Sequence, residues 1–413
     1  MSVLLADVGP GWFRLGLTDE DGAVVRLHHE FAGRGEARLG DLYRAKVHSN
    51  EPRLGGVFCD LGGAQGFLAV KGRSPRVGDT LTVGVRREAI GEKAAQVVPA
   101  PALRLPGATV LQRDGELAVR DGPLAVPEAA EEDVRSKALT LAEQAFAPGL
   151  PGRVEAVSPL LRAVVSMLDA DVAEVRITDP DAAAMLRRWL EPLGVSVALY
   201  DLTAVHAPLD EAETEALARV VPLPGGGRIV FDEAEALTAI DIDTGGRDAR
   251  SAKGAQEAVA AAMLSVIGRQ ASLRGVGGQV VLDLPRRAFA SPKVIRDRLT
   301  KTLAPLGRVS IPAVTNEGVV VVIAPRAGPS LLERLTEGHG EGVRPGRRLR
   351  ADALAAQAHR LLERALAADR SARLTLACPA RARPYLDQAA PTLAARYGDR
   401  FAFQDREGPP DVR

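Results

Sequence analysis

Two acidic stretches separated by a helical segment constrain this chain more than any other feature of its sequence. Residues 238–243 read Thr-Ala-Ile-Asp-Ile-Asp, so that Asp241 and Asp243 alternate with isoleucine. In a strand, this alternation sends both carboxylates to one face and both apolar side chains to the other. Residues 280–283 are the apolar run Val-Val-Leu followed by Asp283. We therefore predict two strands that each carry aspartate near the carboxyl end.

The segment between these strands predicts how they are connected. Residues 255–273 repeat apolar groups at the spacing of one helix face. A strand, a helix and a strand in this order predict a right-handed crossover, which lays the two strands parallel. If the strands are neighbours, Asp241 and Asp283 meet at the carboxyl edge, where open α/β sheets place their sites. Such carboxylates repel one another, and a hard cation such as magnesium relieves the repulsion. The alternative is that the aspartates only cap the turn or helix that follows each strand.

The residues around these aspartates resemble the catalytic core of the ribonuclease E/G family. The order and spacing of three segments carry the resemblance: residues 223–232, residues 235–243, and residues 269–278 leading into Asp283. This family consists of magnesium-dependent endoribonucleases that cut single-stranded RNA. The resemblance implies that Asp241 and Asp283 bind the metal. It also implies that Asp243, where the family usually has asparagine, is the third catalytic residue.

A second resemblance concerns the residues between positions 40 and 98. Five short strands separated by turns predict an OB-type barrel there, and residues 40–47, 57–62 and 66–68 resemble the S1-type RNA-binding domain of the same family. Such barrels stack bases on exposed aromatic rings and pass the phosphates along Lys and Arg. We predict that Phe58 and Phe67 stack on bases; the alternative is that both rings fill the barrel interior. The predicted polar and cationic contacts are Tyr43, Arg44, Lys46 and Lys93.

The resemblance implies an α/β multidomain fold. A ribonuclease-H-like sheet would be interrupted by the S1-type OB barrel and followed by a DNase-I-like α/β catalytic subdomain and a small C-terminal α/β domain. The predicted divisions are 1–39 and 151–220 for the ribonuclease-H-like subdomain, 40–98 for the barrel, 99–150 for a reduced sensor-like region, 221–328 for the catalytic subdomain, 329–350 for a linker and 351–413 for the last domain.

The composition limits the partners that this chain can have. The chain has 53 basic and 53 acidic side chains, so any RNA site must be a local patch. No apolar segment approaches the roughly twenty residues that span a bilayer, and the amino terminus lacks a charged leader, so we expect a cytoplasmic location. Cys59 and Cys378 fall in different predicted domains, which argues against a disulfide framework or a zinc cluster.

Three departures from the family pattern affect the expected activity. The nearest match to the family's Val-Arg-Thr sensor of the RNA 5′ monophosphate is Val-Arg-Asp at 119–121, whose carboxylate repels phosphate. The Cys-Pro-x-Cys element that joins two subunits through zinc is absent, so no structural zinc is expected, and any homo-oligomer would form without it. Residues 259–262 and 322–326 lack the polar groups that the family has in these positions, and such groups orient metal ligands.

The sequence therefore predicts a magnesium-dependent endoribonuclease that cleaves single-stranded RNA, in ribosomal RNA precursors or messenger RNA, to 5′-phosphate and 3′-hydroxyl ends. Asp243 is predicted to position the attacking water or a metal-bound water. The basic residues predicted to lie near the site, which could hold phosphates, are Arg247, Arg250, Lys253, Arg286 and Arg287. The main alternative is a catalytically weakened RNA-binding protein derived from the same family, and a third possibility is a nuclease acting on DNA.

Overall fold

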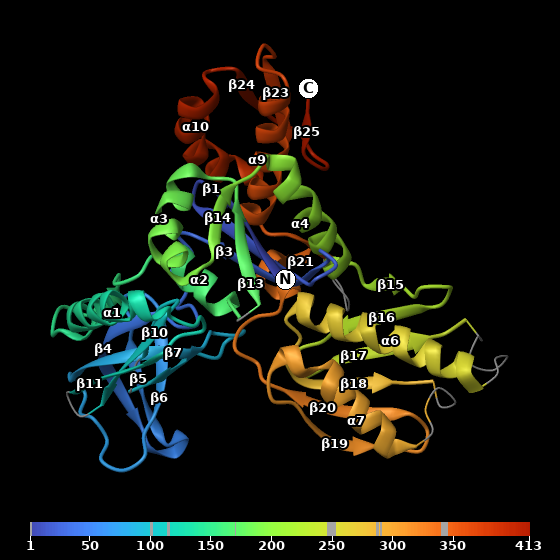
Figure 1. Ribbon diagram of the computed structural model, residues 1–413, viewed down its shortest axis with the longest axis horizontal. Coiled ribbons are helices and arrows are strands. Elements are labelled where there is room, and N and C mark those ends of the chain that lie inside the picture. The colour runs from blue at the N-terminus through green and yellow to red at the C-terminus, as the bar shows by residue number, and fades with distance from the viewer. Residues whose placement is uncertain are drawn as a thin grey trace. The chain divides into compact units, whose positions relative to one another are not determined.

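The computed structural model describes residues 2–99, 102–113, 116–169, 171–245, 253–285, 289, 291–339 and 346–413. The chain divides into two compact units, the first comprising Met1–Gly22, His28–Ala207 and Glu333–Arg413, and the second comprising Ala23–Leu27 and Pro208–Leu332. Several sheets and helices alternate along the chain, which confirms the predicted mixed α/β class (Figure 1). No helix in the described ranges combines the length and the apolar character needed to cross a membrane.

The first unit begins with a five-stranded sheet in the order β14-β13-β1-β2-β3. Its strands are β1 (Ser2–Gly9), β2 (Trp12–Thr18), β3 (Val24–Phe31), β13 (Val172–Ile177) and β14 (Ser196–Leu199). The helices of this part of the chain are α2 (Pro159–Met167), α3 (Pro180–Leu190) and α4 (Leu202–Leu217). Apolar side chains from β1, β2, β13, α2 and α3 form one core, so segments separated by more than a hundred residues complete the same sheet.

The barrel of the first unit contains five strands and closes on itself, as predicted, because β4 pairs with both β5 and β7. The strands are β4 (Leu42–Glu51), β5 (Gly56–Asp60), β6 (Gln65–Ala69), β7 (Thr80–Arg87) and β8 (Ala95–Val98), with β12 (Gly152–Val154) added beside β4. Gly56 has no room for a side chain, because a Cβ atom there would lie 2.6 Å from the Phe67 ring. This glycine therefore lets β5 and β6 approach one another beneath the ring.

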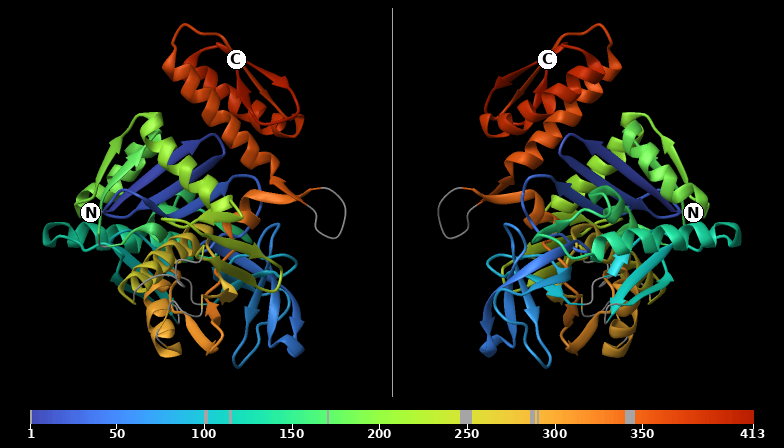
Figure 2. Two further views of the ribbon diagram at one scale, coloured as in Figure 1. Left: turned by 90° about the vertical axis from the view of Figure 1, so that its right-hand side faces the viewer. Right: turned by 90° about the vertical axis from the view of Figure 1, so that its left-hand side faces the viewer.

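The first unit also contains two three-stranded sheets. The first contains β9 (Ala102–Arg104), β10 (Ala108–Arg113) and β11 (Glu116–Asp121), and α1 (Glu131–Phe146) packs on it. The second, near the carboxyl terminus, contains β23 (Leu374–Cys378), β24 (Phe401–Asp405) and β25 (Asp411–Val412), with α9 (Ala351–Ala368) and α10 (Arg383–Tyr397) packed against it (Figure 2). The short 3₁₀ helices of the first unit are η1 (Pro52–Leu54), η2 (Glu128–Ala130), η3 (Glu191–Leu193) and η6 (Ala380–Ala382). The second unit contains η5 (Ala304–Leu306).

The segment predicted as a linker contains regular structure. It holds α8 (Leu331–Leu335), β21 (Thr336–His339) and β22 (Gly346–Leu349). The two strands pair antiparallel, and Arg348 Nε donates to Glu337 Oε1 across them at 2.9 Å. The predicted linker segment therefore includes a pair of antiparallel strands.

The second unit is built on one six-stranded sheet in the order β15-β16-β17-β18-β20-β19. Its elements are β15 (Val220–Pro222), β16 (Arg228–Glu233), β17 (Thr238–Asp243), α6 (Lys253–Arg274), β18 (Gly278–Asp283), α7 (Pro292–Thr302), β19 (Ser310–Val314) and β20 (Val319–Ala324). Strands β17 and β18 are parallel neighbours joined by α6, which confirms the predicted crossover. Buried Ile240, Ile242 and Leu282 share one core with apolar residues of α6 and α7. The two helices therefore pack on one face of the sheet (Figure 1). The exposed aspartates alternate with the buried isoleucines along β17 and so point to the other face.

Candidate functional site

The two aspartates predicted to bind metal lie side by side. Asp241 on β17 and Asp283 on β18 are register partners in the parallel ladder, so about 4.8 Å separates their backbones. Both side chains are exposed, while their neighbours Ile240, Ile242 and Leu282 are buried against the helices. The apolar residues thus fix the strands, and the alternating direction of strand side chains brings the carboxylates out to solvent at one edge.

These two carboxylates have the chemistry that a hydrated divalent cation requires. Among the described residues, no hydrogen-bond or ion-pair partner engages either Asp241 or Asp283. Magnesium prefers oxygen ligands, keeps several of its waters and is commonly held by one or two carboxylates. Within the described ranges, no group of three or more His, Cys, Asp or Glu side chains is arranged to hold a metal. Two exposed carboxylates on neighbouring strands would therefore supply oxygen ligands for a hydrated magnesium ion.

Asp243 lies on the same face of β17 but already has partners. The backbone N–H of Gly245 donates to Asp243 Oδ1 at 2.8 Å, and Arg228 Nε lies 3.9 Å from Asp243 Oδ2. Arg228 and Asp243 are register partners of β16 and β17. Gly227 has a φ of 89°, and a Cβ atom there would lie 2.3 Å from the Asp243 carbonyl oxygen, so only glycine fits. This close turn holds Arg228 beside Asp243.

Arg228 lies within residues 223–232, one of the segments that resemble the family, but the sequence pattern predicts no role for it. A short turn between two strands, at residues 234–237, was the signal that could have placed residue 228 opposite residue 243. Four of the basic residues predicted to hold phosphates, and the side chain of Lys253, lie outside the described part of the chain; the four are Arg247, Arg250, Arg286 and Arg287.

The conspicuous polar residues at the end of α6 support the sheet rather than the site. The Arg274 guanidinium stacks on the Phe231 ring at 4.1 Å and donates to the Ala218 carbonyl at 2.7 Å. Burial lowers the pKa of Arg274 to about 10. Gln270 donates to Glu215 at 2.7 Å. These contacts join α4, α6 and β16. Gln270 and Arg274, which belong to the family-like segment 269–278, therefore stabilise the fold.

On the barrel, Phe58 and Phe67 form a pair on the outer surface. They are register partners of β5 and β6, and their ring centroids lie 5.2 Å apart at 62°. Both rings are half-buried, whereas the next residues along each strand, Cys59 and Leu68, are buried in the barrel core. The alternative that both rings fill the interior does not hold. The pairings continue this outer row from Ser49 through the two rings to Gln96 and Arg87.

Of the other four residues predicted to bind RNA on the barrel, two are engaged within the fold and two are exposed. Tyr43 is only 5% exposed and lies in the barrel core, so the prediction that it contributes to the binding surface is wrong. Burial raises the pKa of its hydroxyl to about 12. Arg44 Nε donates to the Ala147 carbonyl at 2.9 Å beyond the end of α1, which commits this guanidinium to the fold. Lys46 and Lys93 are exposed and remain available for phosphates.

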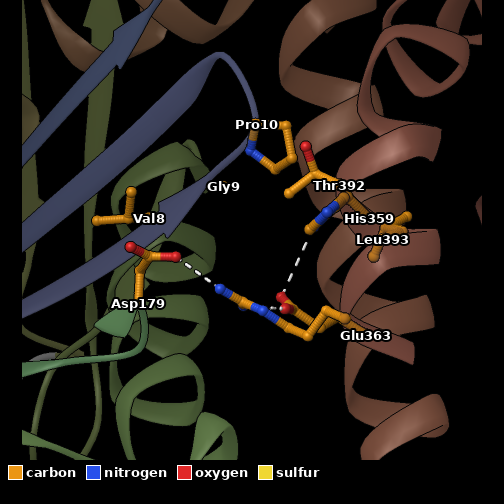
Figure 3. A pocket seen from close by; sticks show the side chains of 9 residues that line it. Val8, Gly9, Pro10, Asp179, His359, Glu363, Thr392 and Leu393 are labelled. Atoms are coloured by element: carbon orange, nitrogen blue, oxygen red, sulfur yellow. Dashed lines mark hydrogen bonds and ion pairs between the residues drawn. The ribbon is translucent and has the colours of Figure 1, made fainter. Parts of the chain in front are cut away.

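A second group of ionisable side chains lies in the first unit, around a cavity of about 170 Å³ (Figure 3). Arg396 of α10 bonds to Glu363 of α9 at 2.9 Å and to Asp179 at 2.6 Å. His359 lines the cavity, is 3% exposed and packs edge-to-face on Trp12 with centroids 5.7 Å apart. Because Arg396 already bridges both carboxylates, this group is best explained as the polar contact that attaches α9 and α10 to the first sheet.

The buried histidine of this cavity predicts a pH dependence of stability. Burial lowers the pKa of His359 to about 4, so the folded chain keeps the ring neutral while the unfolded chain protonates it near pH 6.5. The unfolded state therefore binds more protons in this window, and stability falls as pH decreases from about 6.5 to 4, by up to roughly 1.4 kcal/mol per pH unit. The charged or titratable groups that face the ring are Asp7, His206, Arg360, Glu363 and Arg396.

Comparing thermal unfolding of the wild type and His359→Phe between pH 7 and 4 isolates this contribution. We expect the wild-type Tm to fall more steeply with acidification than that of the variant, because the other ionisable groups are common to both. Parallel profiles would show that His359 is not kept neutral in the folded chain.

The sequence around β17 and β18 is similar to that of known proteins. Residues 141–314, which include β17 and β18, match the family model described as the ribonuclease E/G family. The chain is 29% identical to ribonuclease E of Escherichia coli (strain K12) over 189 residues, which cover 42% of this chain and 17% of that protein. It is 30% identical to ribonuclease E of Haemophilus influenzae over 188 residues, which cover 42% of this chain and 20% of that protein. The chain thus spans no more than a fifth of the length of these two relatives. Over residues 141–314, this chain is therefore similar to the ribonuclease E/G family.

Proposed function

We propose that this chain is a magnesium-dependent endoribonuclease that cleaves single-stranded RNA to 5′-phosphate and 3′-hydroxyl ends. The observation that carries the proposal is the pairing of Asp241 and Asp283, exposed and without partners among the described residues, within the segment that matches the family. Ribosomal RNA precursors or messenger RNA in the cytoplasm are the proposed targets. Any homo-oligomer would form without zinc.

The chain's own groups have separate roles in this proposal. Asp241 and Asp283 would hold the cation at the carboxyl edge of β17 and β18. When bound, magnesium would stabilise charge on the phosphate and lower the pKa of a coordinated water. The rigid strands fix the two carboxylates before RNA arrives, so the site needs little reorganisation. Asp243 is proposed as a positioning residue, either for water, as the sequence predicts, or for the neighbouring Arg228 guanidinium.

The barrel is proposed to bind the RNA strand, as an S1-type domain would. Phe58 and Phe67 offer ring surface on the outer face, with Lys46 and Lys93 exposed on other strands and turns of the same barrel. Stacking of one base on an aromatic ring contributes about 1–3 kcal/mol. This arrangement provides sequence-tolerant binding of a flexible strand.

Replacing Phe67 with alanine is expected to weaken binding of a labelled single-stranded RNA by about 5- to 150-fold, which corresponds to the loss of one stacked base. Fluorescence anisotropy measures the dissociation constant. The matched control is Phe403→Ala, which removes an equally half-buried ring that pairs with Phe401 in the C-terminal sheet. Equal affinities of the two variants would remove the barrel face from the proposal.

A second candidate function, a catalytically weakened RNA-binding protein, is favoured by one specific observation. Helix α6 presents Val259, Ala260, Ala261 and Ala262 where the family has polar groups, and Ala260 is fully buried in the core. No side chain from this turn can then orient a metal ligand. Incubating the purified chain with labelled RNA and magnesium separates the two functions. Cleavage to 5′-phosphate ends supports the nuclease, and binding without cleavage supports the alternative. A parallel assay on DNA of the same sequence tests for a DNA-directed nuclease.

A further inference from the structure

The carboxylate site contains a cation that the proposed mechanism does not use. We propose that Arg228 is a phosphate-binding residue of this site, held in position by Asp243, and that it contacts the RNA backbone next to the cleaved linkage. This inference rests on the proposed function, because it assumes that RNA reaches the edge formed by Asp241 and Asp283.

The register of three strands places Arg228 close to both metal-site aspartates. Arg228 pairs with Asp243, and two residues further along β16 Val230 pairs with Asp241, which in turn pairs with Asp283. The side chains of β16 alternate, so that Ile229 is buried while Arg228 is exposed on the face that carries the carboxylates. A long guanidinium side chain in this position can reach an anion that lies over the aspartate pair.

The contact between Arg228 and Asp243 orients the guanidinium without consuming it. Arg228 Nε lies 3.9 Å from Asp243 Oδ2, and the two side chains are 62% and 54% exposed. A surface pair of this kind contributes at most about 1 kcal/mol, and most of the five N–H donors of the guanidinium remain directed to solvent. Planar guanidinium groups bind phosphate oxygens in a bidentate way.

The positive charge of Arg228 offsets part of the negative charge at this edge of the sheet. Asp241, Asp243 and Asp283 place three negative charges along one edge, and an RNA phosphate would add another. A divalent ion offsets two of these charges, and the exposed Arg228 offsets one more, so the site repels RNA less.

A second arginine of the same unit shows what a purely structural pair looks like. Arg219 binds Asp232 through two parallel bonds, from Nε at 2.6 Å and from Nη2 at 2.8 Å. Asp232 is on β16, like Arg228, but it pairs with Ala239, away from the carboxylate edge. Arg219 is about as exposed as Arg228, at 64%, and therefore serves as a matched control.

The test compares Arg228→Gln, Asp243→Asn and Arg219→Gln in the full chain, with two readouts that do not require cleavage. The first is the affinity for Mn²⁺ alone, measured by titration. The second is the affinity for a labelled single-stranded RNA in Ca²⁺, measured by anisotropy over a range of KCl concentrations.

We expect Arg228→Gln to move the two affinities in opposite directions. Loss of the nearby positive charge should tighten Mn²⁺ binding about 2- to 5-fold. Loss of one phosphate contact should weaken RNA binding about 3- to 10-fold and reduce the slope of log K against log[KCl] by about 0.7. Asp243→Asn should weaken RNA binding about 2- to 3-fold, although it removes a negative charge, because Arg228 loses its orientation. Arg219→Gln should change neither affinity.

If Arg228→Gln and Arg219→Gln give the same RNA affinity and the same salt slope, the proposal is overturned. If Asp243→Asn instead tightens RNA binding, Asp243 does not position the arginine. Failure of the proposed nuclease function has a different signature, since a wild type that binds no Mn²⁺ would refute the metal site while the RNA measurement still reports on Arg228.

Discussion

Replacing Asp241 or Asp283 with asparagine is expected to abolish RNA cleavage and leave the chain folded. Each substitution removes the negative charge of a metal ligand while keeping its shape. The rate should fall by at least about 100-fold, beyond the range of about 10–100-fold typical of residues that only orient a ligand. Because both side chains are exposed and have no partner among the described residues, stability should change by no more than about 0.5 kcal/mol. Initial rates on labelled RNA in magnesium, together with the Tm, measure both effects.

Asp232→Asn is the matched control for these substitutions. Asp232 is an exposed aspartate of the same sheet, but its carboxylate is bound by Arg219 and it lies on β16 away from Asp283. This variant should cleave RNA at the wild-type rate. Equal cleavage by the wild type, the control and both site variants would mean that the carboxylate pair is not the site.

The second large effect is expected for Asp7, which lies fully buried on β1. Its carboxylate accepts a bond from Arg14 Nε at 2.8 Å and lies 2.9 Å from His206 Nε2, and neither partner is exposed. Burial would raise its pKa, but Arg14 and His206 hold the pKa of this carboxyl well below its usual range. Asp7→Ala removes the carboxylate that pairs with the buried Arg14, and breaking a buried ion pair costs about 3–5 kcal/mol.

Thermal unfolding of Asp7→Ala should therefore show a large decrease in the Tm of the first unit. The exposed Asp21→Ala should show almost none. Adding Arg14→Met to Asp7→Ala should recover part of the loss, because an apolar side chain no longer requires a partner. A decrease no larger than that of Asp21→Ala would show that the Asp7 contacts do not stabilise the fold.

Local patterns in the sequence were sufficient to predict several elements of the fold. The alternation in residues 238–243 and the helical spacing of residues 255–273 predict the parallel pair β17 and β18, and the structure confirms it. Five short strands between glycine-rich turns predict the closed barrel in the same way. In both cases the pattern that predicts each element lies within that element and the turns beside it. The names given to the subdomains, and the roles of the three aspartates, stay predictions.

Other features depend on contacts that no local pattern reveals. Alternation places Tyr43 and Arg44 on opposite faces of β4, but closure of the barrel decides that Tyr43 points inward. Arg44 is engaged by the end of α1, about a hundred residues later in the chain. Asp7 meets His206, which lies 199 residues later in the chain. The glycines between β21 and β22 suggested a linker, because side-chain pairing across that hairpin is not visible in composition.

The most direct measurement of the central claim is calorimetric titration of magnesium into the purified wild type and into a variant carrying both Asp241→Asn and Asp283→Asn. The wild type should bind magnesium with an affinity at least about 10-fold higher than that of the double variant. Indistinguishable titrations of the two proteins would contradict the claim that these two strand ends jointly hold the catalytic ion.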